Sequence, residues 1–212
     1  MSGDFEQAKS RVCQSEGTYV TMRPLASSWE QRKVGEVFKI TRGNVLPASE
    51  THSEKTVDHP YPVYSSQTKD NGLMGFYDRY LFEDGVTWTT DGANAGTVRF
   101  RPGRFYSTNV NGVLLSDDGY ANKAVAEALD AVAWKYVSHV GNPKLMNNVM
   151  AEIEITLPQK NTEMEEISRM LIRLDSLITL HQREPPHMMK EDKNANRYQR
   201  RIAFLRLLLA MD

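Results

Sequence analysis

The sequence predicts an α+β protein, in which a β-rich domain is followed by a long amphipathic helix. Up to about residue 120, short β-branched and aromatic runs alternate with Gly, Pro, Asn and Asp, a pattern typical of strands joined by turns. Beyond residue 120, apolar residues recur every three or four positions, as on one face of a helix. With 212 residues, 40% hydrophobic and 25% charged, the chain can bury one good core and does not have a disordered composition.

Residues 1–28 are mixed and polar, without a clear hydrophobic period. We interpret them as a lead-in that is poorly ordered or left over from a longer parent protein. The β-rich domain extends over residues 29–160, with strands expected at 61–65, 85–90, 97–101 and 112–115. Asp91-Gly92, a favoured turn dipeptide, lies between the second and third of these strands.

A helix is predicted over residues 121–140, because apolar residues recur there at helical spacing: Val125, Leu129, Val132, Tyr136 and Val140. Asn122 is a suitable N-cap, and Gly141 followed by Pro143 is a typical helix stop. Isoleucines then alternate with glutamates in a short strand over residues 152–158.

Residues 161–183 have the strongest local helical pattern. Thr162 and Glu165 form a T-x-x-E capping box, and Pro185-Pro186 ends the helix. Its apolar seam with a/d spacing consists of Met164, Ile167, Leu171, Leu174 and Ile178. We interpret this seam as a packing surface for a partner, although the pattern alone is more typical of a helix that faces its own core. Residues 184–212 form a divergent tail, with a short helix expected near its end.

The net charge of −1 does not by itself suggest a nucleic-acid-binding protein, because phosphate neutralisation usually leaves a basic footprint. Arg99, Arg101 and Arg104 are clustered, but such a run most often forms a solvated face. The single cysteine, Cys13, cannot form an internal disulfide, which fits a cytoplasmic location. The longest apolar run, 202–211, is too short to span a bilayer, so no membrane association is expected.

The sequence contains no phosphate-binding glycine loop and no Cys/His spacing suited to zinc. The enzymatic alternative is a metal-dependent nuclease that uses Glu152 and Glu154 with Lys160. The further acidic residue that such a site needs is not identifiable. We therefore expect no catalytic residue and no metal ligand, and we interpret the two glutamates as the exposed face of one strand.

Five segments, in the correct order, resemble the specificity subunits of type I restriction-modification systems. The opening WEQRKVGEVF and the following TRG, within residues 29–43, resemble the start of the family's target-recognition domain, and residues 61–114 resemble its body. The stretch GNPKLMNNVM (141–150) resembles the segment before the exit strand. EIEITLP (152–158) and LDSLITLHQR (174–183) resemble the lead into, and the body of, the conserved spacer helix.

The chain also departs from the family's pattern. The exit strand is followed by Pro158-Gln159, and the helix begins with Met164-Glu165-Glu166, where the family has a second proline and a Glu-Gln pair. Pro185-Pro186 ends the helix several turns early. Full subunits contain two recognition domains joined by paired helices, and this chain contains one. The resemblance therefore identifies a half-subunit, a truncated gene product or an excised part of a longer protein.

The resemblance implies a protein that reads one half of a two-part double-stranded DNA target, without catalysis or a bound cofactor of its own. It implies recruitment of modification subunits, which methylate adenine with S-adenosylmethionine, and of motor-nuclease restriction subunits, which use ATP and Mg²⁺. The helix is expected to act as a spacer, and a homodimer through its seam would recreate two readers. Two alternatives stay open: a fragment that acts only as a dimerising or interaction module, and the stand-alone nuclease.

The residues expected to contact DNA are polar side chains on loops of the β-scaffold, because amides can pair with adenine, arginine with guanine and carboxylates with cytosine. The candidates for base contacts are Ser65, Ser66, Gln67, Asn71, Thr89, Thr90, Asp91, Asn94, Asn109 and Asn111. The cationic candidates for phosphate or guanine contacts are Arg42, Lys69, Arg99, Arg101, Arg104 and Lys144. Many of these residues are individually just as typical of turns. Trp88, Phe100 and Phe105 are expected in the core.

Overall fold

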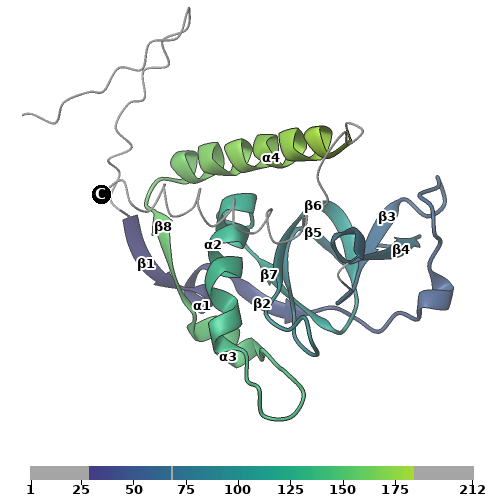
Figure 1. Cartoon of the computed structure of the whole chain (residues 1–212), viewed down its shortest axis with the longest axis horizontal. Helices are drawn as coiled ribbons and strands as arrows, with labels where there is room; N and C mark the ends of the chain where they lie inside the picture. The colour runs from purple at the N-terminus through teal and green to yellow at the C-terminus, as the bar shows by residue number, and fades with distance from the viewer. Residues whose placement is uncertain (1–28, 68, 184–212) are drawn as a thin grey trace, which may run out of the picture.

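A computed structural model describes residues 29–67 and 69–183 of the chain, as a β-sheet domain followed by one long helix (Figure 1). The expectations for residues 1–28 and 184–212 lie outside these ranges. The strands are β1 (Trp29–Lys33), β2 (Lys39–Arg42), β3 (Tyr61–Tyr64), β4 (Leu73–Tyr77), β5 (Phe82–Thr89), β6 (Val98–Ser107), β7 (Asn111–Leu115) and β8 (Glu154–Pro158). The helices are α1 (Val34–Val37), α2 (Lys123–Ala133), α3 (Asn147–Glu152) and α4 (Asn161–Arg183), with 3₁₀ turns η1 (Ala48–Glu50), η2 (Lys69–Gly72) and η3 (Trp134–Tyr136).

Six strands form the main sheet, in the order β2-β7-β5-β6-β3-β4 (labelled in Figure 1). Neighbouring strands are antiparallel except β3 and β6, which run parallel with Val63 opposite Tyr106. β1 and β8 form a separate antiparallel ribbon, in which Trp29 lies opposite Pro158. The ribbon joins the beginning of the domain to the segment that leads into α4.

The core lies between the sheet and α2. Trp88 and Leu114 from the sheet and Leu129 from α2 are fully buried in one cluster, which also contains Leu145 and Met150. The N-cap of α2 is Asn122, as expected, because its Oδ1 accepts a hydrogen bond from Val125 N (3.1 Å). The predicted α+β class, with a β-rich domain and a terminal amphipathic helix, is confirmed. The core position expected for Trp88 and Phe105 is also confirmed, and Phe100 packs half-buried against this cluster.

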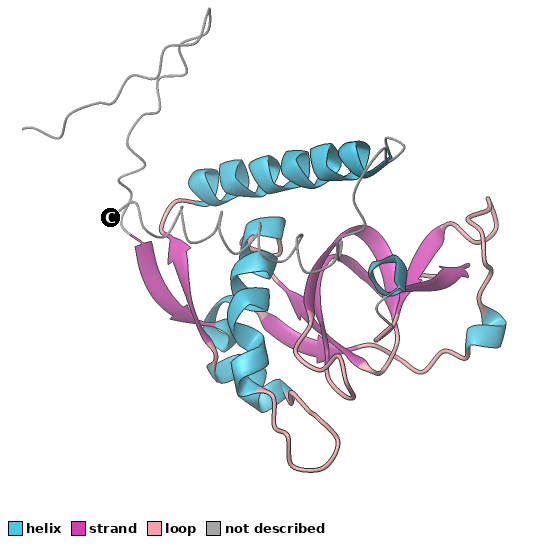
Figure 2. Ribbon diagram, in the orientation of Figure 1, coloured by secondary structure: helices cyan, strands magenta, loops and turns pink. Residues whose placement is uncertain are grey.

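The helix expected over 121–140 is wrong in its second half. α2 ends at Ala133 and passes through η3 into a projecting loop, where Val140 is 92% exposed. Leu145 fills the core in place of Tyr136 and Val140, because Ser138 and Lys144 exchange backbone hydrogen bonds that turn the chain back (Figure 2). Tertiary packing therefore overrides the helical period.

Two further expectations at the end of the domain need correction. Glu152 and Glu154 do not share one strand, since Glu152 ends α3 and Glu154 begins β8. Thr162 is not the N-cap of α4, because the helix begins at Asn161 and the amides of Glu163 and Met164 donate to Lys160 O. Thr162 therefore lies inside the first turn.

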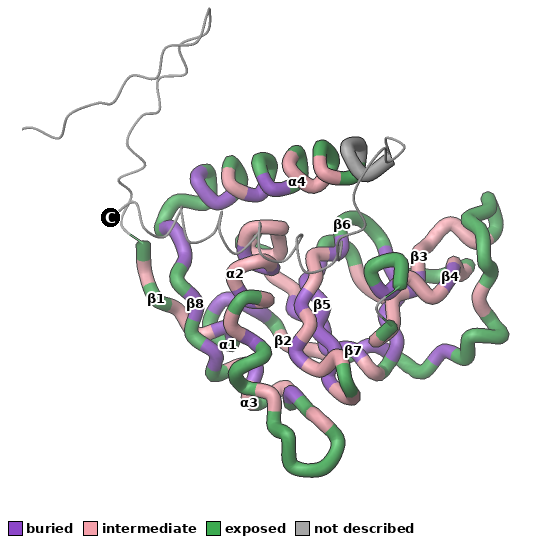
Figure 3. The backbone as a smooth tube through the Cα atoms, in the orientation of Figure 1, coloured by how far each residue is buried: buried purple, intermediate pink, exposed green. Residues whose placement is uncertain are grey.

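α4 lies across the N-terminal end of α2, and buried and exposed positions alternate along it (Figure 3). Of the expected seam, Met164 and Leu171 are buried, while Ile167, Leu174 and Ile178 are half-buried. Met164 belongs to the main core cluster, so the expectation that the whole seam faces a partner is wrong. The seam is shared with the chain's own domain, as in an ordinary core-facing helix. No helix of the described part of the chain is long and apolar enough to cross a membrane.

Lys123 of α2 forms an ion pair that links this helix to α4. Its Nζ lies 2.7 Å from Glu127 Oε1 and 3.1 Å from Asp175 Oδ2, and all three side chains are at most 26% exposed. We expect Lys123→Met to lower the free energy of unfolding by about 1–2 kcal/mol, because two shielded carboxylates lose their shared cation. Urea denaturation measures the loss, and Lys39→Met, at an exposed lysine of β2, serves as the control. Equal stability of the two variants would contradict this role.

Candidate nucleic-acid interface

Five loop segments meet at one end of the main sheet, although they are distant in the sequence. We call residues 42–44, 65–67 with 69–72, 89–96, 107–111 and 143–145 the loop rim. Backbone hydrogen bonds of 2.9 to 3.2 Å join the segments, from Gly43 N to Asn111 O, Thr108 N to Tyr64 O, Thr90 N to Val110 O, and Leu145 N to Thr90 O. Because each loop is tied to a neighbour, the polar side chains of the rim are held in defined positions.

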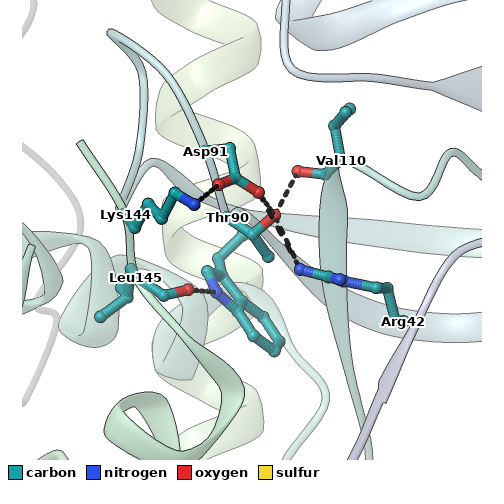
Figure 4. A network of polar contacts seen from close by, with 7 residues as sticks. Arg42, Thr90, Asp91, Val110, Lys144 and Leu145 are labelled. Atoms are coloured by element: carbon teal, nitrogen blue, oxygen red, sulfur yellow. Dashed lines mark hydrogen bonds and ion pairs between the residues drawn. The ribbon is translucent and has the colours of Figure 1, made fainter. Parts of the chain in front are cut away.

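Asp91 lies between two cations at the centre of the loop rim (Figure 4). Its carboxylate is 4.0 Å from Arg42 Nη2 and 3.8 Å from Lys144 Nζ, and these three side chains are 37–50% exposed. Thr90 Oγ1 lies 2.9 Å from Asp91 Oδ2 and 3.0 Å from Val110 O, so its single proton is given to one of them at a time. Exposed pairs at these distances are weak, which leaves both cations available to a phosphate.

The described residues 65–67 and 69–72, which we call the loop 65–72, present polar side chains. Gln67, Lys69 and Asn71 are exposed. Ser65 N donates to Gly72 O (2.9 Å), which closes the loop, and Gln67 Nε2 donates to Leu73 O. Asn71 adopts a positive φ of 55°, between two other residues with positive φ. Such a run of left-handed residues requires support from the surrounding structure.

The loop 65–72 is also linked to the next segment of the rim and to β6. Asn94 Nδ2 donates to Ser66 O (3.0 Å), and Arg99 Nη1 donates to Asn71 Oδ1 (3.3 Å). A polar pocket too small for a base lies between these elements. Its lining includes Ser65, Ser66, Gln67, Thr89, Asn94, Arg99, Arg101 and Asn111.

Several expected DNA-contacting residues are buried and serve the scaffold. Thr89 and Thr90 are 6% and 1% exposed, and Asn111 (2%) donates to Ser107 Oγ (3.4 Å). Arg101 is 5% exposed, and its guanidinium lies 3.7 Å from the centre of the Tyr64 ring. The side chains of these four residues are covered by neighbouring parts of the chain.

The expected arginine cluster does not form a single patch. Arg99 is half-buried and lines the pocket, Arg101 is buried, and Arg104 lies beyond the Pro102-Gly103 turn of β6. Arg104 Nε pairs with Glu83 Oε2 (3.3 Å), and hydrogen bonding to Glu83 raises the Arg104 pKa further. All other candidates belong to the rim or line the pocket, including Asn109, which is exposed on the 107–111 turn.

Sequence reasoning missed the residues that support this arrangement. Thr87 Oγ1 accepts a hydrogen bond from Arg101 Nε (3.1 Å), and Tyr64 stacks on the same guanidinium. Thr108 Oγ1 donates to Ser65 Oγ (3.1 Å) and so joins two rim segments. Thr87 and Tyr64 are of types that are common in strands, and Thr108 lies in the 107–111 turn, so residue type gave no signal of this role.

The glutamates of the nuclease alternative each pair with β1. Glu152 Oε2 lies 2.7 Å from Lys33 Nζ, and Glu154 Oε2 accepts a hydrogen bond from Gln31 Nε2 (2.7 Å). Within residues 29–67 and 69–183, no group of three or more His, Cys, Asp or Glu residues is arranged to hold a metal ion. The geometry therefore favours a structural role for both glutamates.

A protein-family match and the similar proteins of known sequence all belong to one class of protein. Residues 26–187 match the family described as the type I restriction modification DNA specificity domain. A putative type I specificity subunit N-terminus from Mycoplasma pneumoniae is 39% identical over 142 residues, which cover 66% of this chain and 74% of that protein. The type I restriction enzyme MpnII specificity subunit of the same organism is 30% identical over 152 residues, covering 70% of this chain and 44% of that protein.

Solved structures share the fold. The S subunit of a type I restriction-modification system from M. genitalium superposes with a TM-score of 0.58 at 17% identity, over 74% of this chain and 41% of that chain. The HsdS subunit from Thermoanaerobacter tengcongensis gives a TM-score of 0.52 at 15% identity, over 79% and 42%. The chain thus spans less than half the length of these two subunits.

Proposed function

Because the chain belongs to the type I restriction-modification DNA specificity family, we propose that it binds double-stranded DNA sequence-specifically and reads one half of a two-part target. The observation that carries this proposal is the loop rim, where segments from five parts of the sequence are held together with polar and cationic side chains outward. A rigid set of such groups is what recognition of base edges and phosphates requires.

The exposed rim residues divide by chemistry. Gln67, Asn71 and Asn109 are amides that can form bidentate hydrogen bonds with adenine. Arg42, Lys69 and Lys144 supply the phosphate contacts that set register and orientation. Apart from Arg104, which is exposed and pairs with Glu83, the remaining candidates are half-buried or buried and define the shape of the surface.

The chain recognises the target sequence and needs no cofactor for this role. Modification subunits that carry S-adenosylmethionine and restriction subunits that use ATP and Mg²⁺ perform the chemistry in the assembled complex. Such a complex acts on DNA in the cytoplasm. This part of the proposal rests on family membership, since the chain spans only part of its longer relatives.

The test is binding of the purified chain to a pool of random DNA duplexes over a series of salt concentrations, with sequencing of the retained DNA. A short enriched motif is the expected result, and a motif repeated about a fixed gap would report a dimer. Weak, salt-sensitive binding without a motif would favour the interaction-module alternative, which co-purification with a modification subunit then tests. Cleavage of plasmid by the chain alone with Mg²⁺ would support the nuclease alternative.

Self-association through α4 is the second part of the proposal. Met170, Leu174 and Leu177 follow 4-3 spacing, and Met170 and Leu177 are 50% and 53% exposed. In this stripe, defined by those three residues, Met170 and Leu177 are exposed and Leu174 is half-buried between them; we propose that it pairs with the same stripe of a second copy about a two-fold axis.

We expect Met170→Asp combined with Leu177→Asp to weaken self-association at least about tenfold, because two charges would be buried in the interface. Molar mass from light scattering, measured over a concentration series, checks this. Glu166→Gln, at an exposed position of the same helix, is the control. If the double variant and the control have the same mass profile, the stripe is not the dimer interface.

A further inference from the structure

We propose that Arg101 is a positioning residue that holds the loop 65–72 in the conformation that reads DNA. This inference rests on the proposed function and identifies the part of the interface on which base preference depends. Arg101 itself does not contact the bases.

Arg101 is an unusual buried cation. Its residue is 5% exposed, its guanidinium lies 3.7 Å from the centre of the Tyr64 ring, and its Nε donates to Thr87 Oγ1 (3.1 Å). Among the residues that the structure describes, it forms no ion pair with a carboxylate. Burial lowers its pKa to about 10, so the group still carries its charge at neutral pH.

The guanidinium lies directly against the base of the loop 65–72. A Cβ added to Gly72 would be 3.1 Å from Arg101 Nη2 and 2.9 Å from Ser65 O, and Gly72 has a φ of +90°. Gly72 is therefore required by close approach as well as by conformation. Tyr64, on which the guanidinium stacks, immediately precedes the loop, so Arg101 contacts both of its ends.

The loop depends on such support. Asp70, Asn71 and Gly72 all have positive φ, at 49°, 55° and 90°, and non-glycine residues adopt this region only when the surroundings fix them. Arg99 holds the tip through Asn71, and Arg101 supports the base from two positions further along β6. Two arginines on one strand therefore fix the loop at two points.

Stability alone does not explain an arginine at position 101. A buried cation without a carboxylate loses its hydration and gains no attraction from an opposite charge, so its burial costs stability. The benefit of the guanidinium is geometric, because its planar shape stacks on Tyr64 and fills the space under Gly72. Without it, the loop exchanges between conformations that present Gln67, Lys69 and Asn71 differently.

The experiment compares Arg101→Met with the unchanged full-length chain. The matched control is Arg79→Met, which removes an exposed arginine that also lies over a tyrosine ring, that of Tyr77. We measure the thermal midpoint of unfolding and the amide hydrogen exchange of residues 69–72. The random-duplex selection gives the base preference, and binding at several salt concentrations gives the DNA affinity and its salt slope.

We expect Arg101→Met to keep the thermal midpoint of the unchanged chain or to raise it. Exchange at residues 69–72 should rise about tenfold, and preference should fall about tenfold across all base pairs that the loop reads. Affinity for non-target DNA and the salt slope should stay the same, because the phosphate-contacting cations are intact. Arg79→Met should change none of these quantities.

Other outcomes overturn the inference. A salt slope smaller by about one would mark a direct phosphate contact, and a loss of preference at a single base pair would mark direct base contact. Unchanged exchange would show that the loop does not need Arg101. If the unchanged chain selects no motif, the proposed function fails, while the exchange measurement still decides the positioning role. If Arg101→Met does not fold, Tyr64→Leu removes the stack, with the same exchange and preference expected.

Discussion

Trp88→Ala is expected to lower the free energy of unfolding by roughly 3–5 kcal/mol, a large part of the stability of a domain of this size. Trp88 is fully buried at the centre of the main core cluster. Its Nε1 donates to Leu145 O (3.1 Å), so the side chain also holds the segment that precedes α3. Truncation therefore removes apolar burial, leaves a cavity and deprives a buried carbonyl of its donor.

Urea denaturation followed by circular dichroism measures this loss. The matched control is Trp134→Ala, since Trp134 is 58% exposed and its replacement removes an indole of the same size. That change should stay within about 0.5 kcal/mol. A loss of similar size in both variants would mean that Trp88 is not the centre of the core.

The packing around Trp88 also explains why position 112 is a glycine, although the backbone there has an ordinary conformation. A Cβ at Gly112 would lie 2.1 Å from the Trp88 ring, so β7 can pass over the indole only where it has no side chain. The sequence showed a glycine at the start of an expected strand, which is a common observation. The reason for it appears only when β5 and β7 are paired, with Trp88 opposite Gly112.

The sequence predicted best what is decided locally. The N-cap at Asn122 and four of the sheet's strands follow from neighbouring residues, and the existence of all of them is confirmed. β3 and β7 match the predicted bounds within one residue, whereas β5 begins three residues earlier and β6 ends six residues later than predicted. The end of α2 is decided by Leu145, which is twelve residues beyond Ala133, and the pairing of β1 with β8 joins the two ends of the domain. Neither of these long-range contacts leaves a periodic signal in the sequence.

The candidate site was predictable in residue type but not in exposure. The loops with many Asn, Ser and Thr residues do form the rim, because hydrogen bonds such as Thr90 N to Val110 O bring them together. Which side chains face outward depends on the sheet. Arg99 and Arg101 lie two residues apart on β6 and line the same pocket, yet Arg101 is covered by the loop 65–72. That difference cannot be read from spacing alone.

Arg42→Ala combined with Lys144→Ala is expected to weaken DNA binding uniformly across sequences. Each phosphate contact contributes roughly fivefold at about 0.15 M salt, so the pair should cost roughly 25-fold and reduce the salt slope by about two. The loss includes repulsion, because Asp91 lies between these two cations and would then face the phosphates alone. Fluorescence anisotropy with a labelled duplex at several salt concentrations measures both quantities.

The control must remove the same charge elsewhere. Lys39→Ala combined with Arg79→Ala does so, because Lys39 is exposed at the opposite end of β2 from Arg42, and Arg79 lies on the turn between β4 and β5. If both double variants lose affinity equally, binding depends on net charge, and the rim is not the interface. Alternatively, only the variant that lacks Arg42 and Lys144 binds DNA more weakly and with a smaller salt slope, while its base preference persists. In that case the cations beside Asp91 contact the phosphates, and the amides of the rim read the bases.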